Sequence, residues 1–318
     1  MTSAKHPTDF QHRPRFGWRF LHPRYLGVWL FVAIAAVLAL FPYRVRDAVG
    51  GSIGYLFGRG LPKTRHRAEV NLKLCFPQWD QAQRDRVLDQ MYRHIGMSLM
   101  ASATLLVRSE RYLQNHVELI GEEHLMPYLE SGQPVIFMVP HTWFIDFPGV
   151  LLASRGYPMT TMVNPQKNEL VDYLMQKCRS RYGGKLFGRG AGIKRLLDAI
   201  REGHSAYYLP DQDHGMKRSQ YVPFFATHKA TLPGLGKMVD ATGAVVIPMV
   251  ASYDARRGKF QGIIRPAMTD LPSGDAAYDA RRMNEEIEAL ITPRPEQYMW
   301  ILKVLKSRPA GEPDPYRR

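Results

Sequence analysis

Short apolar runs alternate with amphipathic stretches over residues 117–250, a pattern typical of an α/β fold. Residues 135–139 are uninterruptedly apolar and rich in β-branched side chains, which predicts a strand buried on both faces. The other predicted strands are 159–163, 185–187, 205–209, 245–250 and 260–265, and the predicted helices are 147–154, 168–182, 193–201, 232–242, 281–291 and 297–305. We therefore expect a mixed, largely parallel central sheet flanked by helices.

The N-terminal part has a different pattern. Residues 1–24 are polar and basic, and we interpret them as a mobile or interfacial arm. Residues 25–43 contain nineteen uncharged residues, close to the roughly 20 that cross a bilayer as a helix. Tyr25, Trp29 and Tyr43 lie toward the ends of this stretch, as in an aromatic belt. It predicts a membrane-anchoring helix that either spans the bilayer or lies within it; a signal peptide and a buried core helix are the alternatives.

Residues 44–116 are predicted to be helical and close to the membrane. The glycine-rich apolar stretch 47–60 is a candidate for a second membrane-contacting helix. Residues 61–75 mix basic and apolar positions, which suits anionic headgroups but also fits a solvated basic helix face. A long amphipathic helix is expected near 81–107. An α/β domain over 117–306 and a polar tail over 307–318 complete the predicted organisation.

The charge balance favours an anionic partner. Lysine and arginine exceed aspartate and glutamate by 14 in the 318 residues, which suits anionic lipid, a phosphorylated substrate or nucleic acid. No recognition-helix or aromatic RNA-binding motif accompanies the charge, so we expect no nucleic-acid partner. The two cysteines, Cys75 and Cys178, form no Cys-x-x-Cys motif, which disfavours a thiolate zinc site and a disulfide framework.

His141 and Asp146 are the first candidate catalytic residues. His141 comes directly after Pro140, which ends the predicted strand 135–139, and open α/β sheets bind ligands at the carboxyl ends of their strands. On one helix the two side chains would point about 140° apart, so the pair requires a turn between Pro140 and Pro148. His141 could then accept a proton while Asp146 orients it. The alternative is an N-cap aspartate beside an incidental histidine.

Two further blocks carry candidate substrate-binding residues. Arg189 lies between two glycines just before a predicted helix, which suits phosphate binding but also fits an ordinary tight turn. Asp211, Gln212, Asp213 and His214 follow the predicted strand 205–209 and should reach the same sheet edge as His141. They could orient a sugar hydroxyl, hold an arginine, form an Asx turn or bind a metal. Lys229 and neighbouring basic residues could attract a phosphorylated ligand or an acidic carrier protein.

The order of these blocks resembles the glycerolipid acyltransferase superfamily, with its His-x-x-x-x-Asp/Glu signature, and more closely the lipid A late acyltransferases of Gram-negative bacteria. The myristoyltransferase branch is the most similar. The likeness covers nearly the whole chain from residue 20. The stretches that carry it are 22–25, 71–77, 139–146, 207–215, 224–227, 229–233, 282–286, 293–298 and 300–303. The third block departs from the superfamily's Glu-Gly pattern, because it reads Asp211-Gln212-Asp213, as in this branch.

The resemblance implies a membrane-anchored enzyme at the cytoplasmic face of the bacterial inner membrane. It implies transfer of a myristoyl or lauroyl chain from acyl carrier protein to a hydroxyl of a 3-hydroxyacyl chain on a Kdo-bearing lipid A precursor. It assigns the base to His141, its partner to Asp146 and phosphate contact to Arg189; it implies no cofactor. The rival classes are a metal-dependent hydrolase acting on a phosphorylated lipid and a noncatalytic lipid-binding membrane protein.

Overall fold

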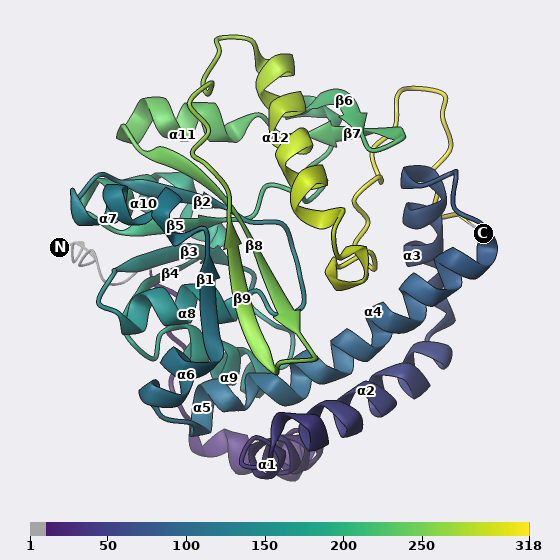
Figure 1. Cartoon of the computed structure of the whole chain (residues 1–318), viewed down its shortest axis with the longest axis vertical. Coiled ribbons are helices and arrows are strands. Elements are labelled where there is room, and N and C mark those ends of the chain that lie inside the picture. Colours follow the sequence, from purple (N-terminus) through teal and green to yellow (C-terminus); the bar gives the residue numbers. More distant parts are fainter. Residues whose placement is uncertain (1–10, 318) are drawn as a thin grey trace, which may run out of the picture.

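A seven-stranded sheet forms the centre of the computed structural model, which describes residues 11–317 (Figure 1). The strand order is β1-β9-β8-β2-β5-β3-β4, and every neighbouring pair is parallel except β8 and β9. The predicted mixed, largely parallel sheet is confirmed. The strands are β1 (Val117–Ile120), β2 (Val135–Met138), β3 (Met159–Val163), β4 (Lys185–Gly188), β5 (Ser205–Tyr208), β8 (Val245–Asp254) and β9 (Lys259–Ile264).

Helices cover both faces of this sheet and extend from it at the N-terminal side. The α-helices are α1 (Leu26–Leu38), α2 (Tyr43–Arg59), α3 (Pro62–Cys75), α4 (Gln81–Ser102), α5 (Thr104–Val107), α6 (Glu110–His116), α7 (Met126–Glu130), α8 (Asp146–Ser154), α9 (Glu169–Arg179), α10 (Ile193–Arg201), α11 (Gly234–Thr242) and α12 (Ala276–Ile291). Short 3₁₀ turns include η5 (Arg189–Ala191), η6 (Met216–Arg218) and η7 (Pro295–Gln297).

Strand β2 lies near the middle of the sheet, between β5 and β8, and all four of its residues are buried. Successive side chains of a strand point to opposite faces. Ile136 and Met138 accordingly join the core that packs against α10, α11 and α12. Val135 and Phe137 join the core on the opposite face, which contains residues of α8. This two-sided burial explains the unbroken apolar run in the sequence.

The predicted membrane-spanning helix at 25–43 is not confirmed. Helix α1 ends at Leu38, and a turn through Pro42 leads into α2. Within residues 11–317, no helix combines the length and the apolar character needed to cross a bilayer. Residues 1–10 of the predicted basic arm lie outside the described part of the chain.

Glycines bring α2 and α4 unusually close, and the two helices run side by side in Figure 1. A Cβ atom added at Gly54 would lie 2.1 Å from the carbonyl oxygen of Tyr92, and one added at Gly96 would lie 1.9 Å from that of Gly50. No side chain fits at such distances. The glycine-rich stretch therefore serves helix packing as well as presenting exposed apolar residues further along α2.

Two features near the C-terminus differ from the prediction. The expected helix over 297–305 is an irregular segment after η7, in which Trp300 is fully buried and its indole nitrogen donates to Pro295 O at 2.8 Å. An antiparallel hairpin, β6 (Gln220–Phe224) and β7 (Thr227–Thr231), was not predicted. Both segments are organised by contacts with distant residues, which local periodicity does not report.

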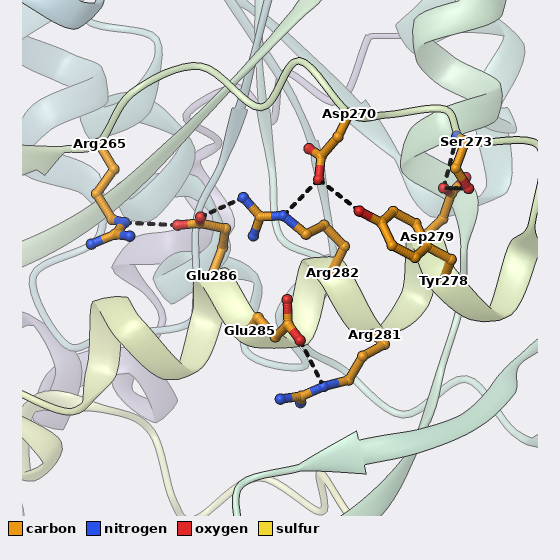
Figure 2. Close-up of polar contacts among 9 residues, drawn as sticks. All are labelled: Arg265, Asp270, Ser273, Tyr278, Asp279, Arg281, Arg282, Glu285 and Glu286. Carbon is orange, nitrogen blue, oxygen red and sulfur yellow. Dashed lines mark hydrogen bonds and ion pairs between the residues drawn. The ribbon is translucent and has the colours of Figure 1, made fainter.

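Helix α12 holds the surrounding loops through a chain of charged side chains (Figure 2). Arg282 donates to Asp270 and Glu286, each at 2.8 Å, and Glu286 also accepts from Arg265 at 2.7 Å. Asn284, on the same helix, donates to Pro223 O at 2.9 Å and so holds the hairpin. The charged residues in 282–286 thus fix α12 to its neighbours.

Candidate active site

His141 lies at the carboxyl end of β2, where Pro140 has ended the strand and the chain enters a turn. The turn is held by a segment from near the C-terminus. The His141 carbonyl accepts from the backbone N–H of Met299 at 2.9 Å, and Gln297 O accepts from Trp143 N at 3.2 Å. The Thr142 hydroxyl donates to Ala251 O at 2.7 Å. These bonds fix the backbone on which the imidazole is mounted.

The carboxylate that contacts His141 comes from the neighbouring strand. Asp211 follows β5, which is paired in parallel with β2, and its side chain is fully buried. One oxygen accepts from His141 N at 2.8 Å and the other lies 2.5 Å from His141 Nδ1. Burial alone would raise the pKa of Asp211, but the interactions with His141 outweigh burial and lower it to about 2. Asp211 is therefore ionised at neutral pH.

The prediction that Asp146 contacts His141 is wrong in this geometry. Asp146 begins α8, and its carboxylate accepts from Arg179 Nε at 2.8 Å and from Arg179 Nη2 at 3.3 Å. The turn after Pro140 does not bring the side chain back to the imidazole, because α8 starts with Asp146 on the side facing α9. The chain between Pro140 and Pro148 thus directs Asp146 into an ion pair with Arg179 and away from His141.

Gln212 connects the second and third predicted blocks. Its amide oxygen accepts from Arg189 Nη2 at 2.5 Å, and its amide nitrogen lies 3.3 Å from His141 Nε2. With Nδ1–H donating to Asp211, Nε2 carries the lone pair and accepts from the Gln212 amide. Arg189, which is exposed, is thereby brought beside the histidine. The prediction that the second and third blocks lie at the same sheet edge as His141 is confirmed for Arg189 and Gln212.

The remaining predicted residues have different surroundings. Asp213 accepts from Ser307 N and Ser307 Oγ, both at 2.6 Å, and so secures the C-terminal segment. Partial loss of solvation and the charges of Arg189 and Lys229 lower the pKa of His214. Lys229 is completely buried. It cannot attract a ligand from solvent, which corrects the expectation drawn from its sequence context.

The described chain offers no metal centre of the kind that the third block allowed. In residues 11–317, no three His, Cys, Asp or Glu side chains are grouped so that they could hold a metal ion. The two carboxylates of the block point to different partners, Asp211 to His141 and Asp213 to Ser307. Cys75 and Cys178 are both buried free thiols.

The sequence indicated the carboxylate that contacts His141 only indirectly. Asp211 follows Pro210 after a strand, just as His141 follows Pro140 after another. This shared Pro-x pattern after a strand could have pointed to Asp211 as the residue beside His141, in place of Asp146. It required the knowledge that the two strands are neighbours, which is a property of the folded sheet.

Comparison with known proteins decides the family. The family model described as bacterial lipid A biosynthesis acyltransferase matches residues 13–307. The chain belongs to the bacterial lipid A biosynthesis acyltransferase family. The resemblance inferred from the sequence motifs is thus confirmed, and the chain is an acyltransferase.

Named relatives match this acyltransferase over almost its full length. A lipid A biosynthesis acyltransferase of Haemophilus influenzae is 44% identical over 95% of this chain and 94% of its own. The lipid A biosynthesis myristoyltransferase of Escherichia coli is 42% identical over 97% of this chain and 95% of its own. A lipid A biosynthesis lauroyltransferase of the same species is 29% identical, over 95% of this chain and 99% of its own. The site described above therefore belongs to a lipid A acyltransferase.

Proposed function

We propose that this acyltransferase moves a fatty acyl chain from the thioester of acyl carrier protein to a hydroxyl of a 3-hydroxyacyl chain on a Kdo-bearing lipid A precursor. The chain is myristoyl in this proposal, with lauroyl as the second choice. The higher identity to the E. coli myristoyltransferase, 42% against 29% for the lauroyltransferase, supports that order. The acceptor class follows from the names of the relatives.

The observation that carries the mechanism is the His141–Asp211 pair at the ends of two neighbouring strands. The His141 side chain is 17% exposed while Asp211 is fully buried, so the imidazole is the member that a substrate can reach. His141 Nε2 takes the proton from the acceptor hydroxyl as the oxygen attacks the thioester carbon. Asp211 holds Nδ1–H, fixes the tautomer and stabilises the transient imidazolium.

The second half of the reaction returns the proton. The tetrahedral intermediate expels the thiolate of the carrier, and this sulfur takes the proton from His141 Nε2. An ester has then formed, a thioester has been cleaved, and the enzyme is back in its starting state. The acyl chain passes directly from donor to acceptor in this scheme, with no acyl-enzyme intermediate. General-base assistance of this kind contributes roughly 10²- to 10⁴-fold to the rate.

Arg189 is proposed to bind a phosphate of the acceptor. Its guanidinium is exposed, sits just ahead of α10 and reaches Gln212 beside His141. A guanidinium can bind a phosphate through two parallel hydrogen bonds. A phosphate held there would place the acceptor next to Nε2. Gln212 would fix the orientation of Arg189 relative to the base.

We further propose that the enzyme rests on the cytoplasmic face of the inner membrane through an apolar surface on its N-terminal helices. Fourteen of the twenty exposed large apolar side chains in residues 11–317 fall between residues 16 and 61. Leu26, Leu30, Ile34 and Val37 form one exposed stripe on α1 at helical spacing. Contiguous exposed apolar surface of this kind is typical of membrane or protein contact sites.

The membrane proposal is tested with a paired substitution. Leu30→Asp combined with Ile34→Asp should reduce sedimentation with vesicles of phosphatidylethanolamine and phosphatidylglycerol at least tenfold, because each charge must be buried in the lipid interface. Ile120→Asp introduces the same charge at an exposed apolar position on the distant strand β1 and should leave binding unchanged. Equal binding by the double variant and the wild type would contradict the proposal.

The chemical proposal is tested with His141→Ala in the full-length enzyme. Purified wild type should add one acyl chain to the lipid A precursor, seen as an increase in mass, and the variant should lose at least 100-fold in rate while keeping its fold and its vesicle binding. Near-wild-type transfer by the variant would refute the mechanism. Loss of wild-type activity on metal chelation would favour the hydrolase alternative, and an unchanged acceptor mass would favour a noncatalytic lipid-binding protein.

A further inference from the structure

An open cleft lies between α2, α4 and the turn η7, and it contains none of the residues of the candidate active site. Its volume is about 840 Å³. Helix α4 forms one wall with Arg86, Asp89 and Arg93, which are three and four residues apart and therefore share one face of the helix. Tyr55 of α2 and Glu296 of η7 line the other sides. The cleft is thus a second polar hollow, built by the N-terminal helices.

Two arginines converge on the ring of Tyr55. Arg59 Cζ lies 4.6 Å from the ring centroid and Arg93 Cζ lies 4.5 Å from it, both within the range of a cation–π contact. Neither guanidinium has a carboxylate partner within residues 11–317. Two like charges are therefore held near one ring without an acidic group between them. An anion that binds there would offset both charges.

The acidic groups of the cleft leave this positive charge uncompensated. Asp89 Oδ1 accepts from Arg65 Nη1 at 3.0 Å, so its charge is already paired. Burial raises the pKa of Glu296, which favours the neutral carboxyl group. Burial also lowers the pKa of His94, which lines the cleft, to about 4, so this imidazole is neutral at neutral pH. Arg86 has no carboxylate partner in the described residues and adds a third positive charge.

Exposed apolar side chains border the cleft. Leu56 and Phe57 directly follow Tyr55 on α2 and are each 66% exposed, and Leu61, just after the helix, is 47% exposed. They belong to the apolar surface of the N-terminal helices described above. A basic hollow beside exposed apolar surface suits an amphiphile, whose phosphate enters the hollow while its acyl chains follow the apolar side chains. An acidic protein surface would match the charge but leave these apolar side chains in water.

We propose that this cleft binds the phosphate of an anionic phospholipid at the membrane surface. Arg86 and Arg93 hold the phosphate oxygens, and the Tyr55 hydroxyl, which donates to no group within residues 11–317, donates to one of them. Arg59 supplies further charge from the other side of the tyrosine. This binding rests on the proposed contact between the N-terminal helices and the membrane, and it adds selectivity for the headgroup.

The test measures how strongly phosphatidylglycerol promotes binding of the full-length enzyme to phosphatidylcholine vesicles. Arg86→Gln and Arg93→Gln should each lower this promotion about fivefold, because each removes one cation close to the anionic surface. Neither side chain has a carboxylate partner in the described residues, so both variants should keep the wild-type melting temperature. Lys237→Gln is the control: it removes one charge at an exposed position on α11, far from α2 and α4 (Figure 1), and should leave the promotion unchanged.

Arg93→Lys separates a phosphate site from diffuse attraction between charges. Lysine keeps the charge but cannot form two parallel hydrogen bonds, so binding to phosphatidylglycerol vesicles should weaken about twofold. Wild-type promotion in Arg93→Gln or in Arg93→Lys, or an equal loss in Lys237→Gln, would overturn the proposal. So would a higher KM for acyl carrier protein in Arg93→Gln with unchanged vesicle binding, because the cleft would then receive the carrier.

Failure of the headgroup site can be distinguished from failure of the membrane contact itself. The Leu30→Asp and Ile34→Asp double variant should weaken binding to vesicles with and without phosphatidylglycerol alike, and so leave the promotion unchanged. The arginine variants should weaken binding only where phosphatidylglycerol is present. Normal binding by the double variant would refute the apolar contact, whereas normal promotion in Arg93→Gln would refute the cleft alone.

Discussion

Replacing Asp211 with asparagine probes the proposed base most directly. Both oxygens of the carboxylate accept from His141, one from the backbone N–H at 2.8 Å and one facing Nδ1 at 2.5 Å. Asparagine offers one oxygen and an NH₂ group, so one of these two donors would face another donor. The imidazole can relieve that clash by moving its proton from Nδ1 to Nε2. Nε2 then has no lone pair with which to take the substrate proton, and we expect kcat to fall about 10²- to 10⁴-fold.

The same substitution should also lower the stability, by an amount that follows from the lowered pKa of Asp211. Burial opposes ionisation, yet the contacts with His141 lower the pKa from 3.8 to about 2. A difference of that size corresponds to about 2 kcal/mol of stability. Because the folded-state pKa is depressed, this contribution is complete above about pH 4 and is lost as pH falls toward 2. Asp211→Asn should remove it at neutral pH.

Two measurements separate the catalytic effect from the structural one. Steady-state rates with acyl carrier protein donor and lipid A precursor acceptor give kcat, and ¹⁵N NMR of the histidines reports which ring nitrogen of His141 carries the proton. Asp146→Asn is the matched control: its partner is Arg179, so it should leave the His141 nitrogen shifts unchanged. Wild-type shifts in Asp211→Asn, or altered shifts in Asp146→Asn alone, would refute the assignment of Asp211.

Two further predictions concern the helical region. Gly96→Ala should lower the unfolding free energy by about 3 kcal/mol, because the new Cβ atom would lie 1.9 Å from Gly50 O and α2 must move away from α4. The control is Gly27→Ala, whose new Cβ atom would meet nothing within 4 Å. This control should be neutral or slightly stabilising in thermal melts. Burial, aided by the charge of Arg294, lowers the pKa of His94 to about 4. The folded state then keeps this imidazole neutral while the unfolded chain protonates it, so stability should fall by about 3 kcal/mol between pH 6.5 and 4. A His94→Gln variant should lack that decline in chemical denaturation, and an identical decline in both proteins would contradict the prediction.

Most elements of the α/β domain could be predicted because their signals are local. The strand β3 and the helix α10 have the predicted bounds, since a buried apolar run and a 3.6-residue period each reflect the burial of neighbouring positions. The helix predicted over 297–305 is absent, because that prediction also used only the local spacing of apolar residues. Apolar residues such as Trp300 are spaced there as on a helix, but Trp300 is fully buried in an irregular segment, and Asn71, distant in sequence, donates to Trp300 O at 2.6 Å.

The N-terminal apolar stretch shows how composition can predict an apolar surface without predicting its geometry. An uncharged stretch over 25–43 is evident in the sequence, but the length of the helix depends on where the chain turns. Pro42 begins a new helix, and Ala35 and Ala39 of the first segment pack against Met100 and Ala103. Part of the apolar surface is therefore buried within the protein. A hydropathy pattern does not distinguish burial against protein from contact with lipid.

The sequence alone determined the fold class, the family and the position of His141 at the end of a strand, because apolar periodicity and motif order are read along one chain. Only the tertiary structure decided which carboxylate contacts His141. Asp146 is five residues away in sequence but lies on a helix that turns it toward Arg179. Asp211 is seventy residues away, yet pairing of β5 with β2 places it 2.5 Å from Nδ1. The reason is physical: a hydrogen bond needs proximity in space, and sheet order, which sets that proximity, depends on how all the strands pack together.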